Sequence, residues 1–143
     1  MKSRTKARSV ALQVLFELDL TDHAIGTALT ERSIDNDLDK GQFEFAQIIA
    51  IGVHTIAFRL DNILAQHAPE WPLDQVAIID RNILRMALWE VAIYKKTPLK
   101  VAINEAIELT KLYGSESSPR FINGVLGSLA DRLDEISSDL QLD

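Results

Sequence analysis

Helical periodicity runs through almost the whole chain, and it constrains the fold more than any other feature of the sequence. Apolar residues recur at intervals of three and four, the spacing that places them on one face of an α-helix. The first stripe falls within residues 7–18, and similar stripes continue to about residue 136. No stretch alternates apolar and polar residues over a useful length, as a half-buried strand would. The sequence therefore predicts an all-α protein of about seven helices, packed as bundles.

Turn and cap residues divide this pattern into segments. We expect a short helix near residues 24–33 and a long segment over 42–67, which is either one bent helix or two. Proline disfavours helical geometry in the residue before it, so Pro69 and Pro72 end the long segment. Asp74 and Asp80 each suit the capping position of a following helix. Another helix is expected over about residues 100–113, with Gly114 as its stop.

The last helix raises a question of its own. Ser118 suits its N-cap and Pro119 its first position, so the helix is expected to run from Ser118 to about Ile136. Asn123 and Gly124 then fall in its second turn, where glycine costs about 1 kcal/mol relative to alanine. The close approach of another helix to Gly124 explains that cost better than direct contact with a ligand, which stays the alternative.

We expect a single domain over residues 1–143, with one helical bundle over about 1–68 and a second over about 69–136. The acidic tail, residues 137–143, is expected to fray. The hydrophobic fraction of 47% is ample for a buried core, and there are no cysteines, which excludes disulfides and thiolate metal sites. No segment approaches the roughly 20 apolar residues of a membrane span. These features predict a cytoplasmic protein.

The charge is unevenly distributed. The net charge is −6, yet residues 1–16 hold four basic side chains and no acid, which leaves −10 on the remainder. A basic end on an acidic body indicates a localised surface for an anion such as nucleic acid. A solvated, frayed terminus explains the same charges equally well.

Catalytic and cofactor motifs are missing from the sequence. His23, His54 and His67 have no partner at the spacing of metal ligands, and their simplest interpretation is surface or helix-end histidine. There is no glycine-rich phosphate loop and no nucleophile elbow. The sequence predicts a binding protein without a cofactor, rather than an enzyme.

Two places combine cations with an aromatic ring. On a helical wheel of the first helix, the side opposite the apolar stripe carries Lys2, Lys6, Ser9, Gln13 and Phe16. Such a set suits single-stranded nucleic acid, because cations neutralise phosphates, amides read base edges and a ring stacks on a base. Burial of Phe16 under a neighbouring helix is the alternative, and the wheel alone slightly favours it.

Arg120 and Phe121 repeat this combination at the start of the last helix. A helix N-terminus offers free N–H groups and a positive dipole to phosphate. Ser117 and Ser118 are expected to add hydroxyl donors there. The pair of patches points to nucleic acid only if the fold brings them together.

Three stretches resemble the NusB family of bacterial transcription antitermination factors. KVAINEAIELTKLYGSESSPRFINGVL, residues 100–126, resembles the signature block of that family. RTKARSVALQVLFELDL and DRNILRMALWE resemble its arginine-rich first helix and its central helix. The resemblance covers about residues 2–133. It implies two packed three-helix bundles and, as a heterodimer with NusE, binding of single-stranded boxA RNA. It further implies that this complex joins the elongating RNA polymerase and supports ribosomal RNA synthesis.

The family's positions are carried over residue by residue. Its basic first helix matches Arg4, Lys6 and Arg8, and Phe16 stands where its aromatic, usually tyrosine, is found. The family's acidic positions for partner binding match Asp74 and Asp80. The RNA-binding residues expected from the patches and the resemblance together are Lys2, Arg4, Lys6, Arg8, Gln13, Phe16, Ser117, Ser118, Arg120 and Phe121.

The sequence departs from the family at two positions. Ser117 stands where the family usually has aspartate, and Gly127 stands where an aspartate usually follows the NGVL motif. The loss of a carboxylate at residue 117 is expected to ease the approach of phosphate and to tighten RNA binding, or to make it less selective. The change at residue 127 is expected to alter only the helix surface.

The sequence is also compatible with other classes of protein. A NusB-like domain also precedes the catalytic domain of certain ribosomal RNA cytosine methyltransferases, although a chain that ends near its last helix is not expected to be one. A purely structural helical adaptor predicts no sequence-dependent RNA binding. The family also contains homodimers that occlude the RNA surface, and the sequence does not decide between monomer and dimer.

Overall fold

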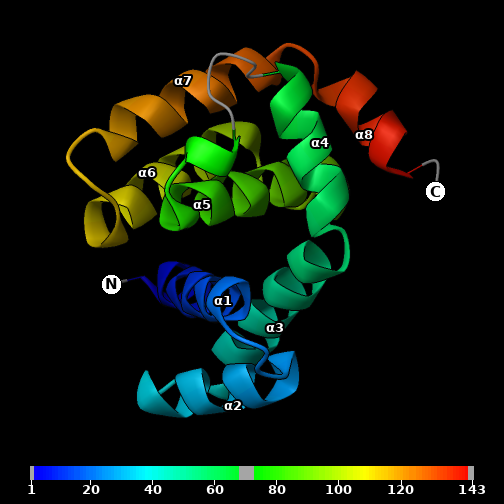
Figure 1. Cartoon of the computed structure of the whole chain (residues 1–143). Helices are drawn as coiled ribbons and strands as arrows, with labels where there is room; N and C mark the ends of the chain where they lie inside the picture. Colours follow the sequence, from blue (N-terminus) through cyan, green and yellow to red (C-terminus); the bar gives the residue numbers. More distant parts are fainter. Residues whose placement is uncertain (1, 68–72, 142–143) are drawn as a thin grey trace. The chain divides into compact units, whose positions relative to one another are not determined.

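The fold is built of helices joined by short turns, as the periodicity predicts. The computed structural model describes residues 2–67 and 73–141, and these ranges contain no strand. In chain order the helices are α1 (Ser3–Leu20), α2 (Ile25–Asp35), α3 (Lys40–Thr55), α4 (Ala57–His67), η1 (Leu73–Gln75), α5 (Ile78–Trp89), η2 (Glu90–Tyr94), α6 (Leu99–Tyr113), α7 (Ser118–Ala130) and α8 (Leu133–Gln141) (Figure 1). The expected all-α class is confirmed.

The chain separates into two compact units, Met1–Thr55 and Ile56–Asp143. The first unit holds α1 to α3, and the second holds the helices from α4 onward. The expected break at Pro69 and Pro72 lies outside the described residues. No single helix in the described ranges is long and apolar enough to cross a membrane, and only α3 and α4 taken together meet the length and composition of a span.

In the first unit, α1 packs against both α2 and α3. The predicted apolar stripe of α1 is its buried face, except that Leu18 is only half-buried. The side chains that form this core are Ala7, Val10, Ala11, Val14 and Leu15 of α1, Ala28 and Leu29 of α2, and Phe45, Ile49 and Val53 of α3. Burial of so many apolar groups is the main favourable term for folding this unit.

In the second unit, α5 packs against α4, α6 and α7. Every residue from Asn82 to Glu90 is buried, so this helix is covered on all sides rather than on one stripe. Arg85 is buried with them because Asp61 of α4 accepts two hydrogen bonds from its guanidinium, at 2.7 Å to Nε and 2.6 Å to Nη2. A buried cation is tolerated when it is paired in this way.

The end of the central helix was predicted, but its geometry was not. After Trp89 the chain continues as a π-helical turn, η2, and Lys95 then adopts a left-handed conformation with φ of 62°. Glu90 is 2% exposed, and its carboxylate accepts a hydrogen bond from Thr97 Oγ1 at 2.9 Å. These contacts fix the turn into α6.

The last predicted helix is in fact two helices. The chain turns at Asp131 and Arg132, so α7 ends at Ala130 and α8 begins at Leu133. The tail was expected to fray from Ser137, and this is wrong as far as Gln141. Leu140 is 4% exposed, and Arg59 Nη2 donates to the carbonyl oxygens of Asp139 and Leu140 at 3.0 and 2.6 Å. Apolar burial and capping of the helix end stabilise a segment that looked polar in sequence.

The explanation expected for Asn123 and Gly124 is also wrong. Both residues are exposed on α7, and a Cβ added to Gly124 would meet no atom within 4 Å. Among residues 2–67 and 73–141, therefore, no helix approaches this glycine closely. Gly114 is the crowded one, because an added Cβ there would lie 2.7 Å from Ser118 Oγ and 2.9 Å from the backbone oxygen of Thr110.

Two of the expected caps shift. The N-cap of α5 is Ala77, so Asp80 lies within the first turn instead of preceding it. The N-cap of α7 is Ser117, one residue before the expected Ser118. Neither N-cap residue makes a side-chain capping hydrogen bond. The side chains of Asp80 and Ser118 bond to one another instead, as described below.

Candidate nucleic-acid interface

The first group of candidate residues lies on α1, in the first unit, and is called the amino-terminal patch: Lys2, Arg4, Lys6, Arg8, Gln13 and Phe16. Lys2 and Arg4 are exposed, while Lys6, Gln13 and Phe16 are half-buried. Arg8 is only 5% exposed. The patch therefore presents three cations to a ligand, and Phe16 is neither fully exposed nor part of the core.

Two arginines of the patch lie over one aromatic ring. The Arg4 guanidinium carbon is 3.9 Å from the ring centroid of Phe45 on α3, and that of Arg8 is 5.1 Å from it. Cation–π attraction of this kind is worth about 0.5–2 kcal/mol. Phe45 thus helps to orient the basic end of α1. In sequence it is one more apolar residue of a periodic helix, so no signal marked this role.

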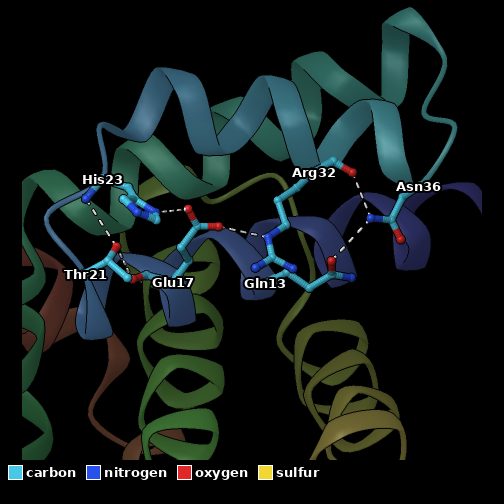
Figure 2. Close-up of polar contacts among 6 residues, drawn as sticks. All are labelled: Gln13, Glu17, Thr21, His23, Arg32 and Asn36. Atoms are coloured by element: carbon cyan, nitrogen blue, oxygen red, sulfur yellow. Dashed lines mark hydrogen bonds and ion pairs between the residues drawn. The ribbon is translucent and has the colours of Figure 1, made fainter.

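Gln13 takes part in a polar network that joins α1 to α2 (Figure 2). Its Oε1 accepts a hydrogen bond from Asn36 Nδ2 at 3.3 Å, and its Nε2 donates to Ser9 Oγ at 3.5 Å. One turn along α1, Glu17 accepts from Arg32 Nε at 3.0 Å. Both ends of the Gln13 amide therefore have partners inside the unit, which is the geometry of a residue that holds α1 in place.

Glu17 is the electrostatic centre of this network. Its carboxylate also lies 2.7 Å from His23 Nδ1. The hydrogen bond with His23, and then that with Arg32, hold the pKa of the Glu17 carboxyl below its ordinary value of 4.5. The carboxylate is thereby kept charged between its two partners, as Figure 2 shows.

The second group lies in the second unit and is called the α7 patch: Ser117, Ser118, Arg120 and Phe121. Ser117 and Arg120 are exposed and Phe121 is half-buried. They border an open groove with a volume of 540 Å³. This volume lies within the range of roughly 300–1,000 Å³ that is typical of ligand sites. The groove is lined by Gln75, Val76, Ala77, Asp80, Ser115, Ser117, Arg120 and Phe121. Nothing in the sequence marked Gln75 and Ser115 as part of this surface.

Ser118 is hydrogen-bonded to Asp80, which lines the groove. Ser118 is 1% exposed, and its hydroxyl donates to Asp80 Oδ2 at 3.0 Å. Asp80 is 8% exposed, whereas Asp74, the other expected partner-binding acid, is exposed on η1. Ser118 and Asp80 therefore bond to each other across 38 residues, from α7 to α5. This hydrogen bond, together with the one from the backbone N–H of Ser115 to Ser118 Oγ, stabilises the turn between α6 and α7.

The two patches belong to separate units of the chain. Within residues 2–67 and 73–141, no three His, Asp or Glu side chains gather as a metal site. What the two patches offer is recognition chemistry: exposed cations, part-exposed aromatic rings and hydroxyl groups beside a groove.

The family model described as "NusB family" matches residues 5–131 of this chain. The protein is 45% identical to the transcription antitermination protein NusB of Roseiflexus castenholzii over 94% of this chain and 96% of that protein. It is 38% identical to the protein of the same name from Bacillus cereus, over 93% of this chain and all of that protein. The chain therefore belongs to the NusB family.

Solved structures agree with this assignment. NusB of T. maritima, 31% identical, superposes with a TM-score of 0.78 over 94% of this chain and 92% of that one. A structure of antitermination factors NusB and NusE in complex with dsRNA contains a chain that is 25% identical and gives a TM-score of 0.83, covering 92% of this chain and 98% of that one. The expected fold and family are both confirmed.

Proposed function

We propose that this protein is an RNA-binding transcription antitermination factor. As a heterodimer with NusE it binds single-stranded boxA RNA of nascent ribosomal RNA transcripts, and the complex joins the elongating RNA polymerase. The observation that carries the proposal is membership of the NusB family together with the likeness to a chain from a NusB–NusE–dsRNA complex. The two cation-and-aromatic patches supply chemistry that suits RNA.

Exposure divides the candidate RNA-binding residues by role. Lys2, Arg4, Lys6 and Arg120 present charges that neutralise phosphates. The part-exposed rings of Phe16 and Phe121 are suited to stacking on bases, which is worth about 1–3 kcal/mol per base. The buried or internally bonded members, Arg8, Gln13 and Ser118, orient the others.

The acidic residues expected to bind NusE divide in the same way. Asp74 is exposed and can meet a basic partner, so we assign it to the NusE interface. Asp80 is buried and accepts the Ser118 hydroxyl, which favours an internal role. Loss of NusE binding in Asp74→Asn, with Asp80→Asn as comparison, tests this division.

The experiment that tests the function is fluorescence anisotropy of a labelled boxA-like RNA, titrated with and without NusE. A scrambled RNA of the same composition and a duplex of the same sequence are the controls. We expect preferential binding of the single-stranded boxA sequence, strengthened by NusE. Equal affinity for the scrambled RNA, or no binding in either condition, would leave a structural adaptor or an occluded homodimer as the better explanation.

Variants connect the binding to the patches. Arg120→Ala and Phe121→Ala are expected to weaken boxA binding, because each removes a side chain that lines the groove. Lys100→Ala is the matched control, since it removes an exposed cation at the start of α6, at the opposite end of that helix from the α7 patch. Equal losses in all three variants would show that the groove has no special role.

A further inference from the structure

Three serine hydroxyls and one carboxylate form a chain of hydrogen bonds at the start of α7. Ser118 Oγ donates to Asp80 Oδ2 at 3.0 Å. Ser115 Oγ lies 3.1 Å from Ser118 Oγ and 3.2 Å from Ser117 Oγ. The backbone N–H of Ser115 also donates to Ser118 Oγ, at 2.9 Å. We call these four residues the serine relay.

The bonds of the serine relay can be made together in only one direction. A serine hydroxyl has one proton to donate, and a carboxylate only accepts. The hydroxyl proton of Ser118 is used in the hydrogen bond to Asp80. Ser115 is therefore the donor in the bond between Ser115 and Ser118. Ser115 then has no proton left for Ser117, and Ser117 must donate to Ser115. The proton of each hydroxyl thus points along the chain toward Asp80.

The direction of the relay determines what Ser117 can offer a ligand. Its proton is engaged with Ser115, while its oxygen is on an exposed residue that borders the groove beside Arg120 and Phe121. The exposed hydroxyl therefore presents lone pairs and acts as an acceptor. The sequence-based expectation was the reverse, a hydroxyl that donates to phosphate.

We propose that Ser117 accepts a hydrogen bond from a donor group of the bound RNA, a ribose 2′-hydroxyl or a base N–H. Phosphate oxygens are acceptors and do not satisfy this site. Ser115, Ser118 and Asp80 are positioning residues, because they act on the ligand only by fixing the direction of the Ser117 proton. The inference rests on the proposed RNA binding and adds the chemical group that this residue selects.

The test is an anisotropy series on the full chain with NusE and chemically altered boxA RNAs. One arm replaces each 2′-hydroxyl in turn by hydrogen, a second replaces bases by analogues that lack one N–H donor, and a third neutralises single phosphates as methylphosphonates. The proteins are wild type, Ser117→Ala and Ser115→Ala. Ser128→Ala is the matched control, since that hydroxyl also lies on α7 but donates to Val125 O at 2.8 Å.

We expect one 2′-deoxy or one base substitution to weaken wild-type binding about five-fold, the size of one neutral hydrogen bond. The same substitution should have no effect on Ser117→Ala, and a full effect on Ser128→Ala. In Ser115→Ala the Ser117 proton is released to point outward, so the penalty for removing the RNA donor should shrink. The arm in which the effect appears identifies the donor.

Two results would overturn the inference while RNA binding stands. One is that every donor substitution is felt equally by wild type and Ser117→Ala. The other is that neutralising a phosphate is the only change whose effect disappears in Ser117→Ala, which would make Ser117 a donor to phosphate. A wild-type protein that fails to prefer boxA RNA would instead overturn the proposed function, and this inference with it. The scrambled RNA separates these cases.

Discussion

The surroundings of Gly114 leave no room for a side chain. An added Cβ would lie 2.7 Å from Ser118 Oγ, 2.8 Å from Ser118 Cβ and 2.9 Å from the backbone oxygen of Thr110. Neither the buried serine nor the backbone can move aside easily. We expect Gly114→Ala to lower the free energy of unfolding by about 1–3 kcal/mol, the usual cost of overpacking. Urea unfolding measures it.

Gly124→Ala is the opposite case on the next helix. An added methyl meets no atom of the described part of the chain within 4 Å, and alanine is favoured over glycine in a helix interior by about 1 kcal/mol. We expect the free energy of unfolding to rise by up to this amount in the same urea experiment. Stabilisation by Gly114→Ala would contradict the close packing at the end of α6, and destabilisation by Gly124→Ala would contradict the open surface of α7 at that residue.

The ion pair between Asp61 and Arg85 joins α4 to α5. The pair is bidentate and largely buried, with side-chain exposures of 26% for Asp61 and 8% for Arg85. Asp61→Ala leaves the buried guanidinium without its carboxylate, which costs about 3 kcal/mol of unfolding free energy. Glu108→Ala is the control, because its pair with Lys111 is exposed and is worth about 0.5 kcal/mol or less. Similar losses in the two variants would contradict this difference.

The contact between α1 and α2 should depend on pH through Glu17. Because its pKa is lowered in the folded protein, Glu17 stabilises the fold above the ordinary pKa of a glutamate and loses that contribution as the pH falls through the folded value. We therefore expect wild type to exceed Glu17→Gln in thermal stability at neutral pH. The difference should hold down to about pH 4.5, the ordinary value, and shrink below it.

Thermal melts followed by circular dichroism between pH 3 and pH 7 measure this difference, because this range includes the ordinary pKa of a glutamate. Glu31→Gln is the control, since it removes an exposed carboxylate of α2 that lies outside the network in Figure 2. A stability gap between wild type and Glu17→Gln that stays constant through this range would exclude the role given to Glu17.

Helix positions followed from apolar spacing wherever one face is buried. The stripe of α1 and the span of α6 were predictable for this reason. The break between α7 and α8 was not predictable, because it contains no proline or glycine and the apolar spacing continues across Asp131 and Arg132. Nor was the order of residues 137–141, which depends on a distant side chain, Arg59. Tertiary contacts of this kind leave no local mark in the sequence.

The candidate site was predictable in its residue types and not in their roles. Cations beside aromatics marked both patches, because such combinations are uncommon on an acidic protein. Ser118 was predicted to bind RNA and Asp80 to bind NusE, yet these two residues, 38 positions apart, bond to each other between α7 and α5. The resemblance likewise placed Arg8 among the RNA-binding residues, although Arg8 is 5% exposed and lies over Phe45. Such pairings are properties of the fold, and spacing along one helix does not contain them.

The distribution of charge over the whole molecule limits how RNA binding can depend on salt. The net charge is −6, and the exposed or part-exposed cations of the two patches are Lys2, Arg4, Lys6 and Arg120. Each phosphate contact with a single strand contributes about −0.7 to the slope of log K against log salt concentration. Four contacts therefore predict a slope of about −3 for the protein alone.

Anisotropy titrations of boxA RNA at several potassium chloride concentrations measure this slope. Arg120→Ala should reduce the magnitude of the slope by about 0.7, because one phosphate contact is lost. Phe121→Ala should weaken binding and leave the slope unchanged, because it removes a stacking contact and no charge. The pair separates charge from stacking at one edge of the groove. A slope steeper than about −7 would require some ten phosphate contacts, more than these patches provide, and would place the RNA on a wider surface of the molecule.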